Sequence, residues 1–308
     1  MTSISEHFPV DASAESSALP RDYLILLKPR VMFLVVFTGL AGLIAAPTHM
    51  HPFLAAVAIL SIALATGAAG AINMWYDRDI DAIMARTAAR PIPQGLIEPS
   101  NALAFGVILT IAAVCMMGLA VNILAAELLA LASFVYIFVY TIWLKRRTPQ
   151  NIVIGGAAGA FPPMIGWAAA TGHIGLAPIA LFAITFFWTP PHFWALALYR
   201  CQDYARAGVP MMSVTAGPAS TKRQMLAYTL LLFPVALSPY FLGIAGPLYL
   251  AGSTILGGLF ILCSVAVLRD ATDRSAKRMF GFSILYLFLL FFLLMIDSGP
   301  GLIARFAG

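Results

Sequence analysis

Long runs of apolar residues alternate with short polar segments along most of the chain. A run of about 20 apolar residues has the length of an α-helix that crosses a bilayer. These runs are long and uninterrupted, which favours membrane-spanning helices over a barrel of short alternating strands. The pattern predicts nine spans, near 24–45, 52–73, 101–121, 124–143, 151–171, 176–198, 225–245, 248–268 and 279–297.

The composition agrees with a membrane protein and excludes a soluble enzyme. Of 308 residues, 61% are hydrophobic and 10% are charged, whereas soluble domains carry about 25% charged residues. The mean hydropathy is +0.91. The three cysteines form no CxxC pair, so they indicate neither a disulfide framework nor a zinc site.

The basic residues predict the orientation of the spans. Lys and Arg occur before the first span and in every second loop after it, and the remaining loops between spans contain none. Positively charged loops lie in the cytoplasm. We therefore expect the N-terminus and the basic loops to be cytoplasmic. The net charge of +5 would attract an anionic substrate or lipid surface to that side.

Residues 1–20 are rich in Ser and Ala, contain three acids and have no Lys or Arg. This composition matches neither a signal peptide nor a mitochondrial transit peptide. We expect a disordered cytoplasmic tail at 1–20, one membrane domain at 21–298 and a short external tail at 299–308. The expected location is a bacterial plasma (inner) membrane, with the active site on the cytoplasmic side.

The densest polar segment, 73–95, follows the second span. Asn73, Asp77 and Asp81 are spaced four apart, so on a helix their side chains would point to one side. A row of oxygen atoms suits Mg²⁺, which prefers one or two carboxylates and completes its shell with water and phosphate. Arg86 and Arg90 follow, and Arg is suited to forked contacts with phosphate.

A simpler interpretation of this segment stays open on these residues alone. Polar loops between membrane helices often carry mixed charge because they are wet. Asp and Arg side chains in such loops form surface ion pairs that contribute little to stability.

Three further features are candidates for function. The loop 199–211 contains Asp203 as its only acid, which is a weak metal signal. The basic segment 145–151 is a membrane anchor by the positive-inside rule or a substrate contact. His192 lies within a predicted span, where an ionisable side chain is a functional candidate or a hydrogen-bonded core residue. We also expect Pro162–Pro163 to break the fifth span.

The combination Asn73-x-x-x-Asp77-x-x-x-Asp81, followed by Met84-x-Arg86-Thr87-x-x-Arg90-Pro91, resembles the first motif of the UbiA superfamily of intramembrane prenyltransferases. Four other stretches resemble the branch of this superfamily that farnesylates protohaem. They are Tyr140-Thr-x-x-Leu-Lys-Arg, Asn151 to Trp167, Pro191-His-Phe-Trp-Ala-Leu-Ala and Asp203-Tyr-x-x-Ala-Gly-Val-Pro-Met.

The resemblance implies an all-α bundle of nine transmembrane helices in which farnesyl diphosphate alkylates a vinyl group of haem B to give haem O. Mg²⁺ is the implied cofactor. Asp77 and Asp81, with Asn73 as a neutral ligand, are the expected metal site. The expected substrate contacts are Arg86, Arg90, Lys145, Arg146, Asn151, His192 and Tyr204, with His192 near the haem.

The second acid-rich motif of the wider superfamily is reduced here. Asp203 is present, but Arg200 and Tyr204 stand where acids are expected. We therefore expect one firmly held ion, with Asp203 assisting or holding a second ion loosely.

Two alternatives are an aromatic prenyltransferase acting on an acid such as 4-hydroxybenzoate and a non-catalytic haem or lipid transporter. The reduced motif disfavours the first, and acids at the edge of the membrane disfavour the second. The resemblance also implies association with a haem A synthase or a terminal oxidase assembly.

Overall fold

Residues 18–298 are described in the computed structural model, and every regular element within that range is a helix. The expected tails at 1–20 and 299–308 lie outside these residues, apart from positions 18–20. The helices are α1 (Pro20–Leu26), α2 (Pro29–Ala45), α3 (Pro52–Tyr76), α4 (Arg78–Ile83), α5 (Pro99–Ala120), α6 (Ile123–Phe134), η1 (Val135–Leu144), α7 (Asn151–Gly155), α8 (Ala157–Thr171), α9 (Leu176–Tyr199), α10 (Cys201–Arg206), α11 (Met212–Thr215), α12 (Gly217–Phe241), α13 (Pro247–Arg269) and α14 (Arg274–Asp297).

The all-helical membrane fold is confirmed, with eight or nine candidate spans. Eight helical stretches in the described residues are long and apolar enough to cross a membrane, and the count is nine when the pair α1–α2, bent by 56°, is taken as one span. Asn151–Thr171 and Ile123–Leu144 each count as one span although each contains two helical segments. The chain is therefore a multi-pass helical membrane protein.

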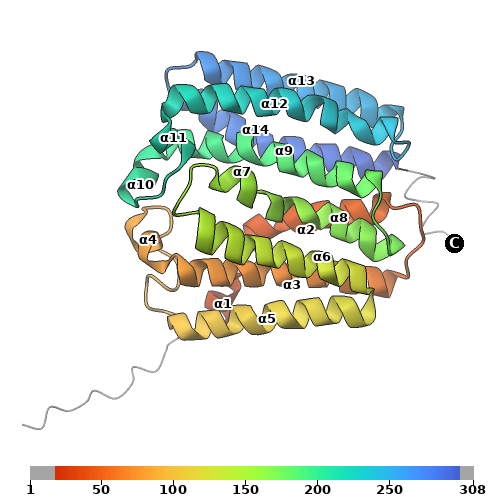
Figure 1. Cartoon of the computed structure of the whole chain (residues 1–308), viewed down its shortest axis with the longest axis horizontal. Helices are drawn as coiled ribbons and strands as arrows, with labels where there is room; N and C mark the ends of the chain where they lie inside the picture. The colour runs from red at the N-terminus through yellow and green to blue at the C-terminus, as the bar shows by residue number, and fades with distance from the viewer. Residues whose placement is uncertain (1–17, 299–308) are drawn as a thin grey trace, which may run out of the picture.

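The long helices lie side by side, and the short helices α4, α10 and α11 gather at one end of the bundle (Figure 1). Residues of α4, α7, α9 and α10 share one buried cluster there, which includes Ile80, Ile152, Ala197 and Tyr204. We call this end the site end. Segments that follow α3 and α9, far apart in the sequence, are thereby packed against each other.

One predicted boundary is wrong. The seventh span was expected at 225–245, but α12 runs from Gly217 to Phe241. Hydropathy alone missed the first two turns because they contain Lys222 and Arg223, which continue the helix beyond its apolar part.

The expected break at Pro162–Pro163 is also absent. Both prolines lie inside α8, and the helical run is interrupted earlier, between α7 and α8 at Gly156. Helix α9 likewise continues through Pro190–Pro191. Proline is tolerated inside membrane helices where neighbouring groups satisfy the freed carbonyl oxygens. Proline pairs in the sequence therefore do not by themselves predict a helix break here.

A π-helical stretch, η1, was not predicted. It extends α6 with a wider turn, in which the Lys145 amide donates to the carbonyl of Tyr140 at 2.9 Å and the Thr141 hydroxyl donates to that of Tyr136 at 2.8 Å. Such stretches are rare and occur frequently at functional sites. Here η1 ends at Leu144, directly before Lys145 and Arg146 at the site end.

Glycines allow α2 and α8 to pack with their backbones close together. A Cβ atom on Gly166 would lie 2.0 Å from the carbonyl oxygen of Gly39, and one on Gly42 would lie 2.0 Å from that of Pro163. Small residues at helix crossings are a common feature of membrane proteins. This contact fixes the bent first span against the centre of the bundle.

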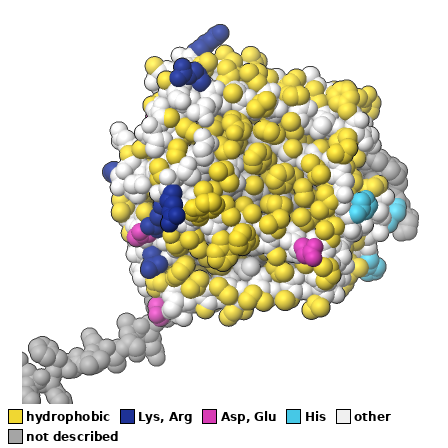
Figure 2. Space-filling view, viewed as in Figure 1, with side chains coloured by type: hydrophobic (Ala, Val, Ile, Leu, Met, Phe, Trp, Pro, Cys, Tyr) yellow, Lys and Arg dark blue, Asp and Glu magenta, His cyan; other side chains and the backbone are white. Residues whose placement is uncertain are grey.

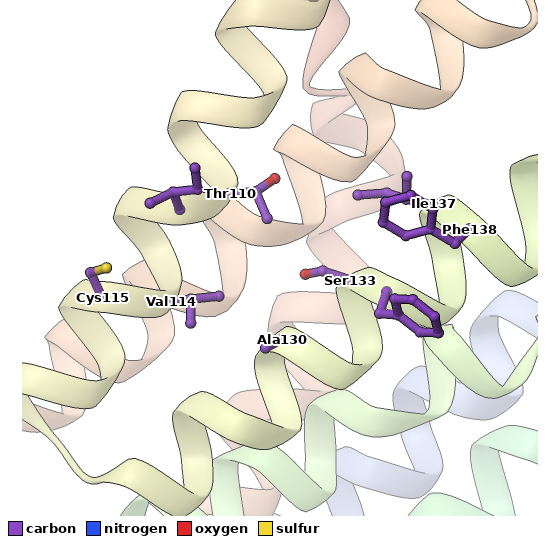
Figure 3. A pocket seen from close by; sticks show the side chains of 9 residues that line it. Thr110, Val114, Cys115, Ala130, Ser133, Ile137 and Phe138 are labelled. Atoms are coloured by element: carbon purple, nitrogen blue, oxygen red, sulfur yellow. The ribbon is translucent and has the colours of Figure 1, made fainter.

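An apolar recess of about 280 Å³ lies between α5 and the α6–η1 helix. Thr110 and Val114 on one side face Ala130, Ser133 and Ile137 on the other (Figure 3). None of the predicted site residues lines this recess, so it is separate from the candidate site.

The face of the bundle seen in Figure 2 carries mainly hydrophobic side chains between its two ends, as a surface in contact with lipid should. In this view the Lys and Arg side chains lie toward the site end, and the visible His side chains lie at the opposite end. The separation of charge predicted from the loops therefore appears on the folded surface.

Candidate functional site

The predicted row of oxygen-bearing side chains faces the interior of the protein. Asn73 lies in the last turn of α3, Asp77 at the junction of α3 and α4, and Asp81 within α4. Their exposed fractions are 4%, 0% and 2%. The Asn73 amide nitrogen donates to Asp77 Oδ2 at 2.7 Å. The i, i+4 spacing correctly predicted the contact between Asn73 and Asp77, and Asp81, four residues further on, is buried as well.

Each member of the row contacts a cation, and two of the three cations come from distant parts of the sequence. Lys145 Nζ donates to Asp77 Oδ2, Arg90 donates to Asp81 Oδ2 at 2.5 Å, and Lys28 Nζ donates to Asn73 Oδ1 at 2.8 Å. Burying a carboxylate is costly unless it is paired. The cations therefore stabilise the buried acids and also concentrate positive charge around them.

Lys28 was missed as a site residue. The sequence presented it only as a basic residue beside the first span, but it lies in the bend between α1 and α2 with a left-handed backbone, φ 54°. Its side chain passes over Gly70 of α3, where a Cβ atom would lie 3.5 Å from Lys28 Cδ. A left-handed backbone at a non-glycine residue costs free energy. At this bend it directs the Lys28 amine to Asn73.

Arg146 forms an ion pair with Asp79, an acid next to the row. Its guanidinium donates to both carboxylate oxygens of Asp79, at 2.6 and 2.7 Å, and to the carbonyl of Tyr76 at 3.0 Å. Its hydrogen bonds lower the pKa of Asp79 to about 2, and Asp79 raises the pKa of Arg146. This pair joins the segment after η1 to α4 and borders the site.

Arg86 differs from the other predicted phosphate contacts. It is exposed, and its side chain has no hydrogen bond or ion pair within residues 18–298. It follows α4 in the segment that leads to Arg90. Arg86 is therefore an uncommitted cation at the site end.

The second polar motif lies on α10. Asp203 is buried and pairs with Arg206, while Arg200 lies 3.6 Å from its other oxygen. Tyr204 is buried in the same cluster as Ile80 of α4. The structure thus brings both predicted motifs to the site end.

Asn151 begins α7 and is fully buried. Its amide nitrogen donates to the carbonyl of Thr148 at 2.6 Å, but its Oδ1 atom has no hydrogen-bond partner among the described residues. Buried polar atoms are rarely left without a partner. This oxygen is available to a bound molecule.

His192 is buried between two aromatic rings. Its ring centroid lies 4.4 Å from that of Trp188 and 4.7 Å from that of Phe280, both nearly parallel. Its Nδ1 atom is 2.6 Å from the hydroxyl of Ser283. The contact with Ser283 and the stacking fix the ring and leave Nε2 as the nitrogen available to a ligand.

The residues of the row fit a Mg²⁺ ion that takes part of its ligands from the protein and the rest from water and phosphate. Asp77 Oδ1 is buried without a hydrogen bond, and the Arg146 guanidinium lies 3.6 Å from it. Residues 18–298 contain no group of three or more His, Cys, Asp and Glu placed to hold a metal. Mg²⁺ needs only one or two carboxylates when water and phosphate supply its other ligands.

Known proteins resemble this chain along nearly its whole length. The family described as UbiA prenyltransferase matches residues 34–295. A protein of Acidiphilium cryptum (strain JF-5) named protoheme IX farnesyltransferase is 60% identical over 285 residues, which cover 90% of each chain.

Solved structures share the fold at low sequence identity. The structure described for digeranylgeranylglyceryl phosphate synthase has a TM-score of 0.75 at 19% identity and covers 90% of this chain and 97% of its own. A UbiA homolog from Archaeoglobus fulgidus bound to GPP and Mg²⁺ has a TM-score of 0.62 at 16% identity and covers 89% and 99%. This chain belongs to the UbiA prenyltransferase family.

Proposed function

We propose that this protein transfers the farnesyl group of farnesyl diphosphate to a vinyl group of haem B, which gives haem O and diphosphate. The name of the Acidiphilium relative and the extent of the match support the two substrates. The observation that carries the proposal is the buried row of Asn73, Asp77 and Asp81, surrounded by cations at the end of an apolar bundle.

We place the site end on the cytoplasmic side of a bacterial plasma membrane. The basic loops gather at that end, and positively charged loops stay in the cytoplasm. Water-soluble diphosphate can then leave directly into the cytoplasm. The apolar surface of the bundle supports a location within the bilayer.

In this proposal Asp77 and Asp81 hold Mg²⁺ together with the diphosphate, and Asn73 positions Asp77 through its 2.7 Å hydrogen bond. When bound, the ion supplies positive charge that stabilises the departing diphosphate. The support is the unpartnered Oδ1 atom of Asp77 and the presence of Mg²⁺ with a prenyl diphosphate in the Archaeoglobus homolog.

The cations around the row bind the diphosphate. Arg86 makes the first contact because it has no competing partner among the described residues. Lys28, Arg90 and Lys145 then share their N–H groups between the acids and the phosphate oxygens. Fixed donors aimed at developing negative charge are among the largest contributions to catalysis.

Transfer breaks the bond between farnesyl C1 and its diphosphate oxygen, and the diphosphate keeps the electron pair. The π electrons of the haem vinyl group form the new carbon–carbon bond to C1. A water molecule then adds to the resulting carbocation and loses a proton, which leaves the hydroxyl group of haem O. Apolar walls protect the allylic cation from early reaction with water.

A site in the bilayer suits the farnesyl chain. Its 15 carbons represent roughly 10 kcal/mol of gross preference for an apolar environment, at about 0.8 kcal/mol per CH₂. A site between membrane helices receives this substrate without extracting it into water. The surrounding spans of this chain are apolar along their length.

The remaining predicted residues receive supporting roles. His192 contacts the haem through Nε2, and Asn151 Oδ1 accepts a hydrogen bond from a bound group. Asp203 positions the departing group or holds a second ion loosely. Tyr204 packs against α4 and shapes the wall of the site.

Purified protein incubated with Mg²⁺, farnesyl diphosphate and haem B tests this function. We expect a heavier haem whose mass equals haem B plus one farnesyl group and one hydroxyl, together with free diphosphate. Replacing haem B with 4-hydroxybenzoate should give no prenylated product. Prenylated benzoate, or unchanged haem in an otherwise active preparation, would overturn the proposal.

A further inference from the structure

Helices α9 and α14 carry a column of aromatic rings that leads from the interior to the site end. His192 stacks on Phe280 at 4.7 Å, and Tyr199 meets Phe280 edge-on with ring centroids 6.1 Å apart. Tyr199 lies about two helical turns beyond His192 on α9. The column therefore extends from the buried histidine to the last residue of that helix.

Two exposed cations, Lys277 of α14 and Arg200 at the junction of α9 and α10, converge on the outer ring of this column. Lys277 Nζ lies 5.8 Å from the centre of the Tyr199 ring, and the Arg200 guanidinium lies 5.9 Å from it. A cation within about 6 Å of a ring centre is attracted by the negative face of the ring. The convergence places two positive charges at one edge of an aromatic surface.

The two cations differ in their carboxylate partners. The Lys277 side chain has no hydrogen bond or ion pair with any described residue. Arg200 forms an ion pair with Asp203 at 3.6 Å, and Asp203 is also held by Arg206 through its other oxygen. Lys277 is therefore available to an external anion, and Arg200 shares its only acid with a second cation.

Cations at span ends also anchor membrane helices, and α14 has others for that purpose. Arg278 is adjacent to Lys277 and exposed, but it makes no contact with Tyr199. Anchoring explains a basic helix end, whereas it does not explain why Lys277 of α14 lies against a ring at the end of a different helix, beside Arg200.

The arrangement fits a broad, flat, apolar molecule with carboxylates along one edge. Haem B has this form, because its two propionates lie on the edge opposite its vinyl groups. We propose that Lys277 and Arg200 bind the propionates of haem B while Tyr199 and Phe280 pack against the tetrapyrrole. This assignment rests on the proposed function and adds the residues that orient the acceptor.

This orientation agrees with the position of the other substrate. With the propionates at the end of the bundle, the vinyl edge points toward the interior. Arg200 is linked through Asp203 to α10, and α10 packs against α4 in the buried cluster of the site end, so both substrate sites lie at that end. Lys277 and Arg200 thus select which edge of the haem reaches the allylic carbon.

Binding titrations of the full chain in detergent, followed by the haem absorption spectrum, test the assignment. The probes are haem B and its dimethyl ester, in which both propionates are esterified. We expect the wild type to bind haem B more tightly than the ester. Lys277→Gln should weaken haem B binding about fivefold, as expected for one charged contact, and leave the ester unaffected.

Matched variants separate this role from general effects on folding. Lys277→Arg should keep the preference for haem B, and Arg278→Gln should behave as the wild type with both probes. Equal affinity of Lys277→Gln and wild type for haem B would overturn the assignment. Equal weakening of haem B and ester would also overturn it, because that result indicates a structural defect.

The turnover assay distinguishes failure of this assignment from failure of the proposed function. If both are correct, Lys277→Gln raises the KM for haem B and leaves the KM for farnesyl diphosphate unchanged. A wild type that farnesylates haem B while Lys277→Gln keeps a normal KM refutes only the propionate site. A wild type without transfer refutes the function itself.

Discussion

Lys28 and Asn73 are 45 positions apart in the sequence, yet the Lys28 amine donates a 2.8 Å hydrogen bond to Asn73 Oδ1. This contact closes the first span over the buried row that follows the second span. The oxygen that the sequence suggested as a neutral metal ligand is thus bound to an amine. Lys28 therefore acts on the same group that positions Asp77.

Lys28→Gln should reduce kcat/KM for farnesyl diphosphate by about 10- to 100-fold, the usual effect of removing one donor from a site of developing negative charge. Arg30→Gln is the matched control, because Arg30 is exposed two residues further on and makes no ion pair in the described structure. The control should retain wild-type kinetics. Equal kinetics for Lys28→Gln and wild type would remove Lys28 from the site.

The pair of Asp79 and Arg146 predicts an effect of pH on stability. The folded pKa of Asp79 is lowered from 3.8 to about 2 by its hydrogen bonds with Arg146. A lowered carboxyl pKa contributes stability above the unfolded value, and that contribution is lost as the pH falls from about 4 to about 2. Asp79→Asn should therefore lower the Tm at pH 7 but not near pH 2.

The expected shift is small, because Asp79 is 60% exposed and surface ion pairs contribute roughly 0.2–1 kcal/mol. A reduction in Tm of a few degrees at most should appear in thermal unfolding at pH 7. The same reduction at pH 7 and pH 2 would show that the ion pair is not its cause.

The contact between α2 and α8 predicts opposite effects for two glycines of one helix. Gly166→Ala should destabilise the bundle, since its new Cβ would lie 2.0 Å from the carbonyl oxygen of Gly39. Gly159→Ala meets nothing within 4 Å and should be neutral or stabilising by up to about 1 kcal/mol. Thermal unfolding of both variants checks the pair, and a Gly166→Ala protein as stable as Gly159→Ala would contradict the observed packing.

His192→Ala should alter the absorption spectrum of bound haem, because the variant removes the Nε2 atom that the stack and Ser283 leave available. His173→Ala is the control, since His173 is exposed in the loop before α9. Titration of each variant with haem B gives the comparison. An unchanged spectrum for His192→Ala would remove this residue from the haem site.

Local spacing predicted the acidic row but not its surroundings. The i, i+4 interval brought Asn73 and Asp77 into contact although Asp77 lies at a helix junction, and Asp81, four residues further on, is also buried. The alternative interpretation, that this segment is a solvent-exposed loop, is excluded for these three side chains, because each is at most 4% exposed. Apolar run lengths similarly predicted the spans, because crossing a bilayer sets the length of a helix.

Features that depend on distant packing were not predictable. The bend that brings Lys28 to Asn73 requires a left-handed residue and the small surface of Gly70. The widening of η1, which precedes Lys145, has no recognisable signal in the sequence. The predicted break at the prolines of α8 was wrong for the same reason, because neighbouring helices decide whether a proline breaks a span.

The central claim is that the Asp77 carboxylate enables departure of the diphosphate, and a turnover assay of Asp77→Asn tests it most directly. The variant keeps the shape of the side chain, and its Tm and membrane insertion should be measured alongside. The account predicts a folded protein that forms no farnesylated haem at any Mg²⁺ concentration. Substantial Mg²⁺-dependent production of farnesylated haem by Asp77→Asn would contradict it.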